Sequence, residues 1–193
     1  METESYHLAI VEALLIASEL PVTQERIDDT IGEEFRINLP ELVEKLNQIY
    51  TESRRSFFIM EVAGGYQIVT RKSYEELVRR YLNRSGRMRL SNAALEALAI
   101  IAYRQPIARP DIDQIRGVNS DGVLSTLLEK ELIMVAGRAD SPGRPLLYKT
   151  SQEFLRYFGL NSTADLPRLK ELEEMLAQKP QTIQEAEKEN ASE

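Results

Sequence analysis

The stretch Leu90–Leu160, LSNAALEALAIIAYRQPIARPDIDQIRGVNSDGVLSTLLEKELIMVAGRADSPGRPLLYKTSQEFLRYFGL, is the most strongly patterned part of the chain. In its first half, apolar residues recur at helical spacing, and proline and glycine interrupt the pattern twice. Ser91 is a suitable N-cap, and Pro106 ends the helix because the residue before a proline avoids helical backbone. This pattern predicts three helices: from Ser91 to Arg104, from about Pro110 to Arg116, and from about Asp121 to Lys130.

The second half of the stretch changes from helical to strand character. Leu132–Ala136 and Leu146–Thr150 are short runs with strand propensity, and the Gly- and Pro-rich segment Gly137–Pro145 between them is typical of a hairpin tip. A last helix is predicted over Ser151–Phe158. Three helices followed by a two-stranded wing indicate a winged helix, so the predicted fold class is mainly α (α+β).

The residues before this stretch repeat the same order of elements. An apolar helix over Tyr6–Leu20 precedes a short helix capped by Thr23 and a third helix that starts near Pro40. Two strands follow, Phe57–Val62 and Tyr66–Thr70, and then a fourth helix opened by Ser73. Single matches such as Pro21-Val22 with Pro106-Ile107 are weak, but the shared order supports two winged-helix domains in tandem.

The predicted division of the chain follows from this repeat. We expect an N-terminal winged helix at 1–86 and a C-terminal winged helix at 87–160, joined by a short basic linker at about 83–89. A short helical extension is expected at 161–178. The acidic segment 179–193 contains almost no apolar residues, which predicts a disordered tail.

Composition narrows the class of protein. Of the 193 residues none is cysteine, which excludes disulfides and thiolate metal sites and favours a reducing cytoplasm. No apolar run approaches the roughly 18 residues of a membrane span, and the acidic N-terminus does not resemble a signal peptide. The net charge is −7, whereas a DNA-binding protein of this size is more often basic. When the chain is divided into residues 1–86, 87–160 and 161–193, only 87–160 has a basic excess, with 10 basic and 8 acidic residues.

The sequence contains no recognisable catalytic group. Its one histidine, His7, has no cysteine or second histidine to join it, so a residue at the core edge is favoured over a metal ligand. The pairs Asp28-Asp29 and Glu33-Glu34 are interpreted as solvated faces because adjacent helical residues diverge. No phosphate-binding or nucleophile motif is present. We therefore expect no enzyme activity, no cofactor and no metal.

The winged-helix prediction raises the question of DNA binding. The third helix of each domain exposes acidic residues, among them Glu41, Glu44 and Glu129, which repel phosphates at close range. Surplus apolar residues such as Ile10, Ile16 and Tyr103 fit protein binding equally well as core packing. Arg138 and Arg144 in the predicted wing tip have two open interpretations, a structural turn or a pair of guanidiniums that grips a carboxylate or phosphate.

The second domain also closely resembles a known family. The segments IAYRQPI, IRGV, GRP with YKT, FLRYFGL and ADLP resemble segregation and condensation protein B, the kite-type subunit of the bacterial condensin formed with an SMC ATPase and a kleisin. The resemblance covers about Ser5–Leu169 and is looser in the first domain. Glu131 departs from it, since glycine is expected there before the wing, and Ser162-Thr163 before ADLP also matches loosely.

The resemblance implies a non-enzymatic subunit that supports chromosome condensation and partition, cell cycle and cell division, in the nucleoid-associated cytoplasm. It implies a homodimer formed by the first domain and binding of the kleisin, segregation and condensation protein A, largely by the second domain. DNA contact is expected to be weak or indirect, through the SMC partner, and no membrane is involved. A winged-helix transcriptional regulator is the alternative. The candidate residues are Ile10, Leu14 and Ile16 for dimerisation and Tyr103, Arg104, Arg138, Arg144 and Tyr148 for the kleisin.

Overall fold

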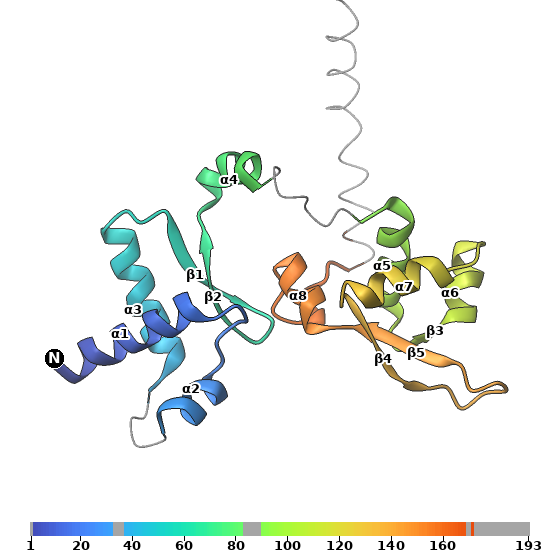
Figure 1. Ribbon diagram of the computed structural model, residues 1–193, viewed down its shortest axis with the longest axis horizontal. Coiled ribbons are helices and arrows are strands. Elements are labelled where there is room, and N and C mark those ends of the chain that lie inside the picture. Colours follow the sequence, from blue (N-terminus) through green and yellow to red (C-terminus); the bar gives the residue numbers. More distant parts are fainter. Residues whose placement is uncertain (1, 33–36, 83–89, 169–170, 172–193) are drawn as a thin grey trace, which may run out of the picture. The chain divides into compact units, whose positions relative to one another are not determined.

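The computed structural model describes residues 2–32, 37–82, 90–168 and 171. Two winged-helix domains follow one another along the chain, as predicted (Figure 1). The predicted linker and tail, and residues 169–170 and 172–178 of the helical extension, lie outside the described residues. Of the extension, the structure shows a 3-10 turn at Thr163–Asp165. Among the helices that are described, none is long and apolar enough to cross a membrane.

The first domain consists of a three-helix unit, a hairpin and a trailing helix. Thr23 Oγ1 accepts a hydrogen bond from the backbone N of Arg26 at 3.2 Å, which caps the second helix as predicted. Asn38 caps the third helix in the same way. The elements are α1 Glu2–Ala17, α2 Gln24–Ile31, α3 Leu39–Glu52, β1 Phe57–Val62, β2 Gly65–Thr70, a 3-10 turn at Lys72–Tyr74 and α4 Glu75–Leu82.

The core of the first domain joins all three helices to the hairpin. Its buried residues include Val11, Leu15, Val22, Ile27, Leu39, Val43, Leu46 and Ile59. The sequence pattern placed Ile49 on the buried face of α3, which is wrong: Ile49 is 46% exposed, and Tyr50 is buried instead. The Tyr50 hydroxyl donates to Glu12 Oε1 at 2.7 Å. Burial, with the hydrogen bond to Glu12, raises the pKa of Tyr50 above its ordinary value.

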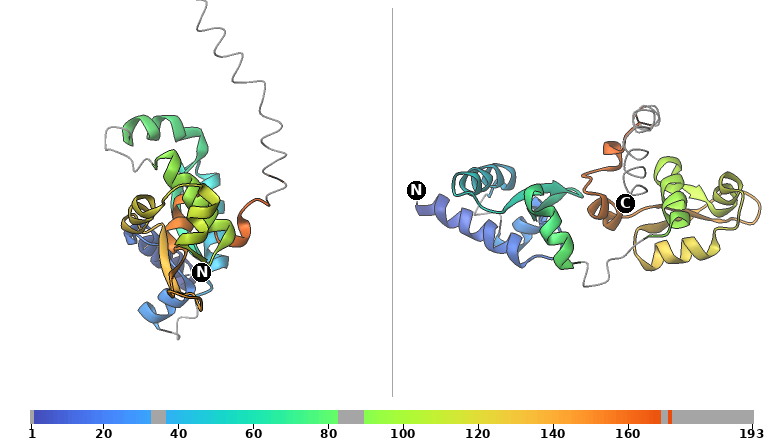
Figure 2. Two further views of the ribbon diagram at one scale, coloured as in Figure 1. Left: turned by 90° about the vertical axis from the view of Figure 1, so that its right-hand side faces the viewer. Right: turned by 90° about the horizontal axis from the view of Figure 1, so that it is seen from above.

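The second domain has the same order, with one additional strand. β3 pairs with β5, and β5 pairs with β4, so that a three-stranded antiparallel sheet forms in the order β3-β5-β4. Figure 1 and Figure 2 show β4 and β5 running as a narrow ribbon away from the helices of this domain. The elements are α5 Asn92–Arg104, β3 Ile107–Ala108, α6 Arg109–Arg116, α7 Asp121–Glu129, β4 Ile133–Arg138, β5 Leu146–Thr150 and α8 Gln152–Phe158.

The core of the second domain lies between α5, α6 and α7. Ala97, Leu98, Ile101, Ile112, Leu124, Leu127 and Leu132 are buried. The predicted stripe was partly wrong, because Leu95, Leu128 and Phe158 are 42%, 36% and 44% exposed. One charged side chain enters this core. Arg116, 4% exposed, donates to Glu96 and to the fully buried Ser120 hydroxyl, which fixes the turn between α6 and α7.

The weak sequence repeat corresponds to a repeated contact. In the first domain, Val22 and Tyr66 exchange both backbone hydrogen bonds at 2.8 Å, which forms an isolated bridge. In the second domain, Ile107 pairs with Tyr148 in the same place between the first helix and the wing. Gly65 lies beside this bridge, where a Cβ would meet the Val22 carbonyl at 2.9 Å, so the close approach requires glycine.

Candidate protein-binding surfaces

Each winged helix carries a surface hollow with an apolar lining. In the second domain, a groove of about 510 Å³ runs between the end of α5, β3, the start of α6 and the wing tip. Its lining is mainly apolar, with one cation and one carboxylate. The lining residues are Arg104, Pro106, Ile107, Ala108, Pro110, Asp111, Ile115, Ala139, Ser141, Pro142, Pro145 and Leu147.

The side chain of Gln105, the residue after α5, fixes the floor of this groove. Gln105 Oε1 accepts hydrogen bonds from the backbone N of Thr150 at 2.7 Å and from Thr150 Oγ1 at 2.8 Å. These bonds attach the end of α5 to β5 and hold the short strand β3 in the sheet. The Gln105–Pro106 peptide bond is cis. The two prolines that flank β3 lack N–H donors, so this edge of the groove presents few competing backbone donors.

The wing tip forms the other wall of the groove. Arg138 Nη1 donates to the carbonyl of Arg144 at 3.1 Å, and Ala139 N donates to the carbonyl of Pro145 at 2.9 Å. The backbone N of Arg144 donates to Ser141 O, and Arg144 has a φ of 42°. The side chain of Arg138 therefore contributes to the turn itself, while the exposed guanidinium of Arg144 forms no hydrogen bond or ion pair within the described residues.

The structure brings some of the kleisin candidates together and separates others. Arg104 is exposed and lines the groove, whereas Arg138 and Arg144 belong to the wing tip but are not among the residues that line the groove. Tyr103 is half-buried. Tyr148 is only 9% exposed, and its side chain belongs to the core.

Sequence reasoning missed the apolar members of the groove. Ile115 is 53% exposed in the wall formed by α6, and Leu147 lies half-buried in β5. The two prolines of the wing tip, Pro142 and Pro145, were interpreted only as turn residues. The available signal was the density of proline around β3 and the tip, since proline is apolar and has no donor that needs a partner.

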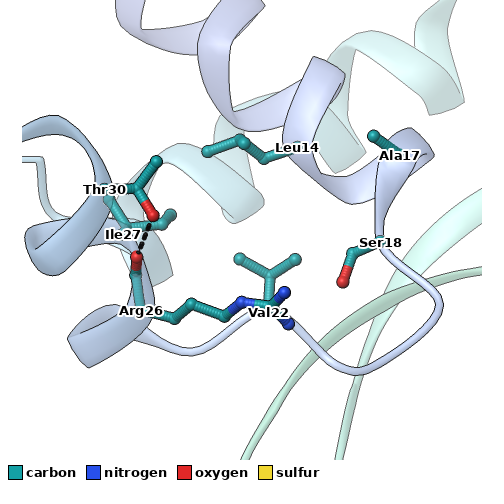
Figure 3. Close-up of a pocket in the computed structure, with 7 residues that line it drawn as sticks. All are labelled: Leu14, Ala17, Ser18, Val22, Arg26, Ile27 and Thr30. Atoms are coloured by element: carbon teal, nitrogen blue, oxygen red, sulfur yellow. Dashed lines mark hydrogen bonds between the residues drawn. The ribbon is translucent and has the colours of Figure 1, made fainter.

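The first domain has a smaller hollow between α1 and α2. It encloses about 220 Å³ and is shown in Figure 3, where Leu14, Val22 and Ile27 line it and Thr30 Oγ1 donates to the Arg26 carbonyl. Ala17 and Ser18 at the end of α1 complete it. The apolar lining and this volume suit one large apolar side chain from a partner surface.

The three dimerisation candidates differ in their exposure. Ile10 and Leu14 are half-buried against the core, and Leu14 also lines the hollow. Ile16 is 70% exposed, and Leu20, which sequence reasoning did not select, is 53% exposed. The C-terminal part of α1 and the segment after it thus present exposed apolar side chains, while Leu14, on another face of the helix from Ile16, lines the hollow.

A further apolar surface lies on α4. Leu77 is 65% exposed and Tyr81 is 80% exposed, although the sequence pattern identified both as an apolar stripe. No residue of α4 is buried.

The sequence is similar to known proteins over most of its length. The family model for the segregation and condensation complex subunit ScpB matches residues 9–169. The chain is 50% identical over 167 residues to segregation and condensation protein B of Syntrophotalea carbinolica, covering 86% of this chain and 84% of that protein. It is 42% identical to the Clostridium tetani protein of the same name, covering 89% and 90% of the two chains. It is also similar to the crystal structure of ScpB from Mycobacterium tuberculosis, with 30% identity, coverage of 81% and 97%, and a TM-score of 0.37.

Proposed function

Because this chain belongs to the family of segregation and condensation complex subunit ScpB, we propose that it is a non-enzymatic, homodimeric subunit that binds a kleisin. The partner is the kleisin subunit segregation and condensation protein A, which links this subunit to an SMC ATPase. The protein acts in the nucleoid-associated cytoplasm, where it supports chromosome condensation and partition. The observation that carries the proposal is the presence of exposed apolar residues on both domains of a family member.

The dimer is proposed to form through the end of α1. Ile16 and Leu20 are exposed apolar residues at the end of α1 and just after it. In a two-fold interface each surface meets its own copy, so the exposed apolar side chains of one α1 end can pack against those of the other. Ile10 supports this surface from the half-buried face of the helix.

The kleisin is proposed to occupy the groove beside the second wing. Ile115 and Leu147 provide apolar contact area, and Arg104 and Arg144 are placed to pair with carboxylates at the rim. Tyr148 is buried in the core, and it pairs in the sheet with Ile107, which lines the groove. A groove with an apolar floor and a charged rim is expected to hold its partner at high salt.

The dimer is tested with Ile16→Glu. A charge at a desolvated apolar contact should weaken dimerisation by roughly 30-fold, which corresponds to about 2 kcal/mol. The measurement is the molar mass from light scattering across a dilution series. Ile115→Glu, on the other domain, is the matched control and should leave the mass unchanged. A monomeric wild-type chain, or equal masses for both variants, contradicts the proposed surface.

The groove is tested with the same two variants, with Ile115→Glu now as the test and Ile16→Glu as the control. Ile115→Glu should reduce binding of a labelled kleisin central segment by at least about tenfold, while the complex of the wild-type chain should persist in high salt. Calorimetric titration measures both. If Ile115→Glu binds the segment like the wild type, the kleisin lies elsewhere on the chain.

The alternative function, a sequence-specific transcriptional regulator, makes a different prediction. It requires the third helix of a domain to enter the major groove, yet Glu41 and Glu44 are exposed on α3. Strong preference for one duplex sequence over unrelated ones would favour the regulator.

A further inference from the structure

Four cations gather at the base of the first wing. Arg54 and Arg55 precede β1, and Arg71 and Lys72 follow β2. The hairpin brings the two pairs together, because Arg71 N donates to Ser56 O at 2.8 Å and Arg71 Nε donates to Arg55 O at 2.9 Å. We call Arg54, Arg55, Arg71 and Lys72 the wing-base cluster.

One member of the cluster is held in place and three are exposed. Arg71 is half-buried, donates from Nη2 to Thr51 Oγ1 at 3.1 Å, and lies over the Phe58 ring at 5.8 Å. Arg54, Arg55 and Lys72 are exposed. Within residues 2–32, 37–82 and 90–168, no carboxylate forms an ion pair with any of the four.

The neighbouring acids are engaged elsewhere. Glu52 accepts a hydrogen bond from Gln48 at 2.9 Å. Glu75 and Glu76 on α4 pair with Arg79 and Arg80. A depression of about 380 Å³ beside the cluster is lined by Arg71, Lys72, Glu75 and Arg79 over the apolar outer face of the hairpin. The cluster therefore keeps a local surplus of positive charge.

This surplus contrasts with the rest of the first domain. Residues 1–50 contain 3 basic and 11 acidic residues, whereas residues 51–80 contain 6 basic and 4 acidic residues. The positive charge of this domain is thus concentrated in the wing and the helix that follows it (Figure 1). A basic patch on one side of an otherwise acidic domain is the electrostatic pattern that directs a polyanion to one site.

We propose that the wing-base cluster binds the phosphate backbone of double-stranded DNA without reading its sequence. A duplex presents a negative charge about every 1.7 Å along its axis, so exposed cations meet phosphates without a shaped pocket. The acidic third helix prevents entry into the major groove, which leaves backbone contact through the wing. This inference goes beyond the proposed function, because the contact needs neither the dimer surface nor the kleisin groove.

The test uses the full chain, a fluorescein-labelled 30-bp duplex and anisotropy over a range of KCl concentrations. Four phosphate contacts predict a slope of log K against log salt of about −3.6, and Arg55→Gln/Lys72→Gln should reduce it to about −1.8. In the part of the chain that the structure describes, only the backbones of these two residues form hydrogen bonds, so the fold should persist. The charge-matched control is Lys45→Gln/Lys130→Gln, which should keep the wild-type slope.

The outcomes are distinct. A reduced slope in the wing-base variant alone supports the site. Equal slopes in both variants, or a clear preference between two unrelated duplexes, overturn it. Loss of kleisin binding by the wing-base variant with unchanged DNA binding also overturns it, since the cluster would then serve an acidic protein segment. If DNA binding fails while dimer mass and kleisin affinity persist, this inference fails and the proposed function stands.

Discussion

The two winged helices share one order of elements, but their wings differ in the turn that joins the two strands and in the exposure of the strands. The first wing turns tightly at Ala63 and Gly64, and most of its hairpin residues are half-buried or buried. In the second wing, five of the six residues of β4 are exposed, and a longer tip borders a groove. The comparison teaches that one fold can use its hairpin as part of the core in one copy and as an open wall in the other.

The side chain that anchors each wing also differs. In the first domain, Asn47 of α3 exchanges two hydrogen bonds of 2.8 Å with the backbone of Ile59 in β1. In the second domain, Gln105 at the end of α5 accepts from Thr150 in β5. The first wing is thus fixed from the third helix of its domain and the second from the end of the first helix of its domain.

The largest expected effect comes from the two cores. Leu46→Ala and Leu127→Ala each remove a buried leucine and should cost about 3 kcal/mol of unfolding free energy. Hydrogen exchange should show each loss mainly in the amides of the mutated domain. An equal loss of protection in both domains would contradict two separately stabilised domains, because the chain would then unfold as one unit.

The wing anchors should give intermediate effects. Asn47→Ala leaves Ile59 N–H and C=O without partners, and Gln105→Ala removes the acceptor of Thr150 N–H and Oγ1–H, so each should cost about 2 kcal/mol. Urea unfolding measures the cost.

The two anchor variants should also differ in their effect on kleisin binding. Gln105→Ala should weaken kleisin binding, because β3 forms part of the groove, whereas Asn47→Ala should not. Equal loss of binding in both variants would contradict the assignment of the groove to the second domain.

The smallest effects concern two residues with positive φ, one beside each wing. Glu131 has a φ of 56° and Ala63 a φ of 52°. Glycine relieves this strain but loses more backbone entropy on folding, so Glu131→Gly and Ala63→Gly should each stabilise by about 0.5 kcal/mol or less. Differential scanning calorimetry of the pair measures the shift. A loss of stability in either variant would mean that a side chain contact outweighs the strain.

Much of the fold was predictable because short-range rules govern it. Thr23 and Ser91 cap helices where the sequence placed caps, and β5 has the predicted bounds. The family resemblance leads us to expect glycine at position 131, and Glu131 has the left-handed backbone that favours glycine. The faces of the helices were less predictable. Ile49 and Leu128 fit a helical stripe. The side of each helix that is buried depends on where the hairpin packs, and this packing is a long-range contact.

The candidate surfaces were predicted in part. Arg104 and Tyr148 are both kleisin candidates from the sequence, and Arg104 lines the groove whereas Tyr148 is buried. Ile115 was missed because an isolated isoleucine in a short amphipathic helix resembles a core residue. A groove is formed by segments that are distant in sequence, so its members share no local pattern. The candidates stay predictions until a complex is mapped.

The bulge in β4 has a consequence for solubility. β4 is an edge strand whose exposed residues include Met134 and Val135, which is the kind of edge that can template intermolecular strand pairing. The register shifts between Val135 and Gly137, so Ala136 has no partner in β5. This interruption divides the edge into pieces shorter than the six or seven residues that amyloid-like stacking needs. Arg138, at the end of the strand, adds a charge that discourages such stacking.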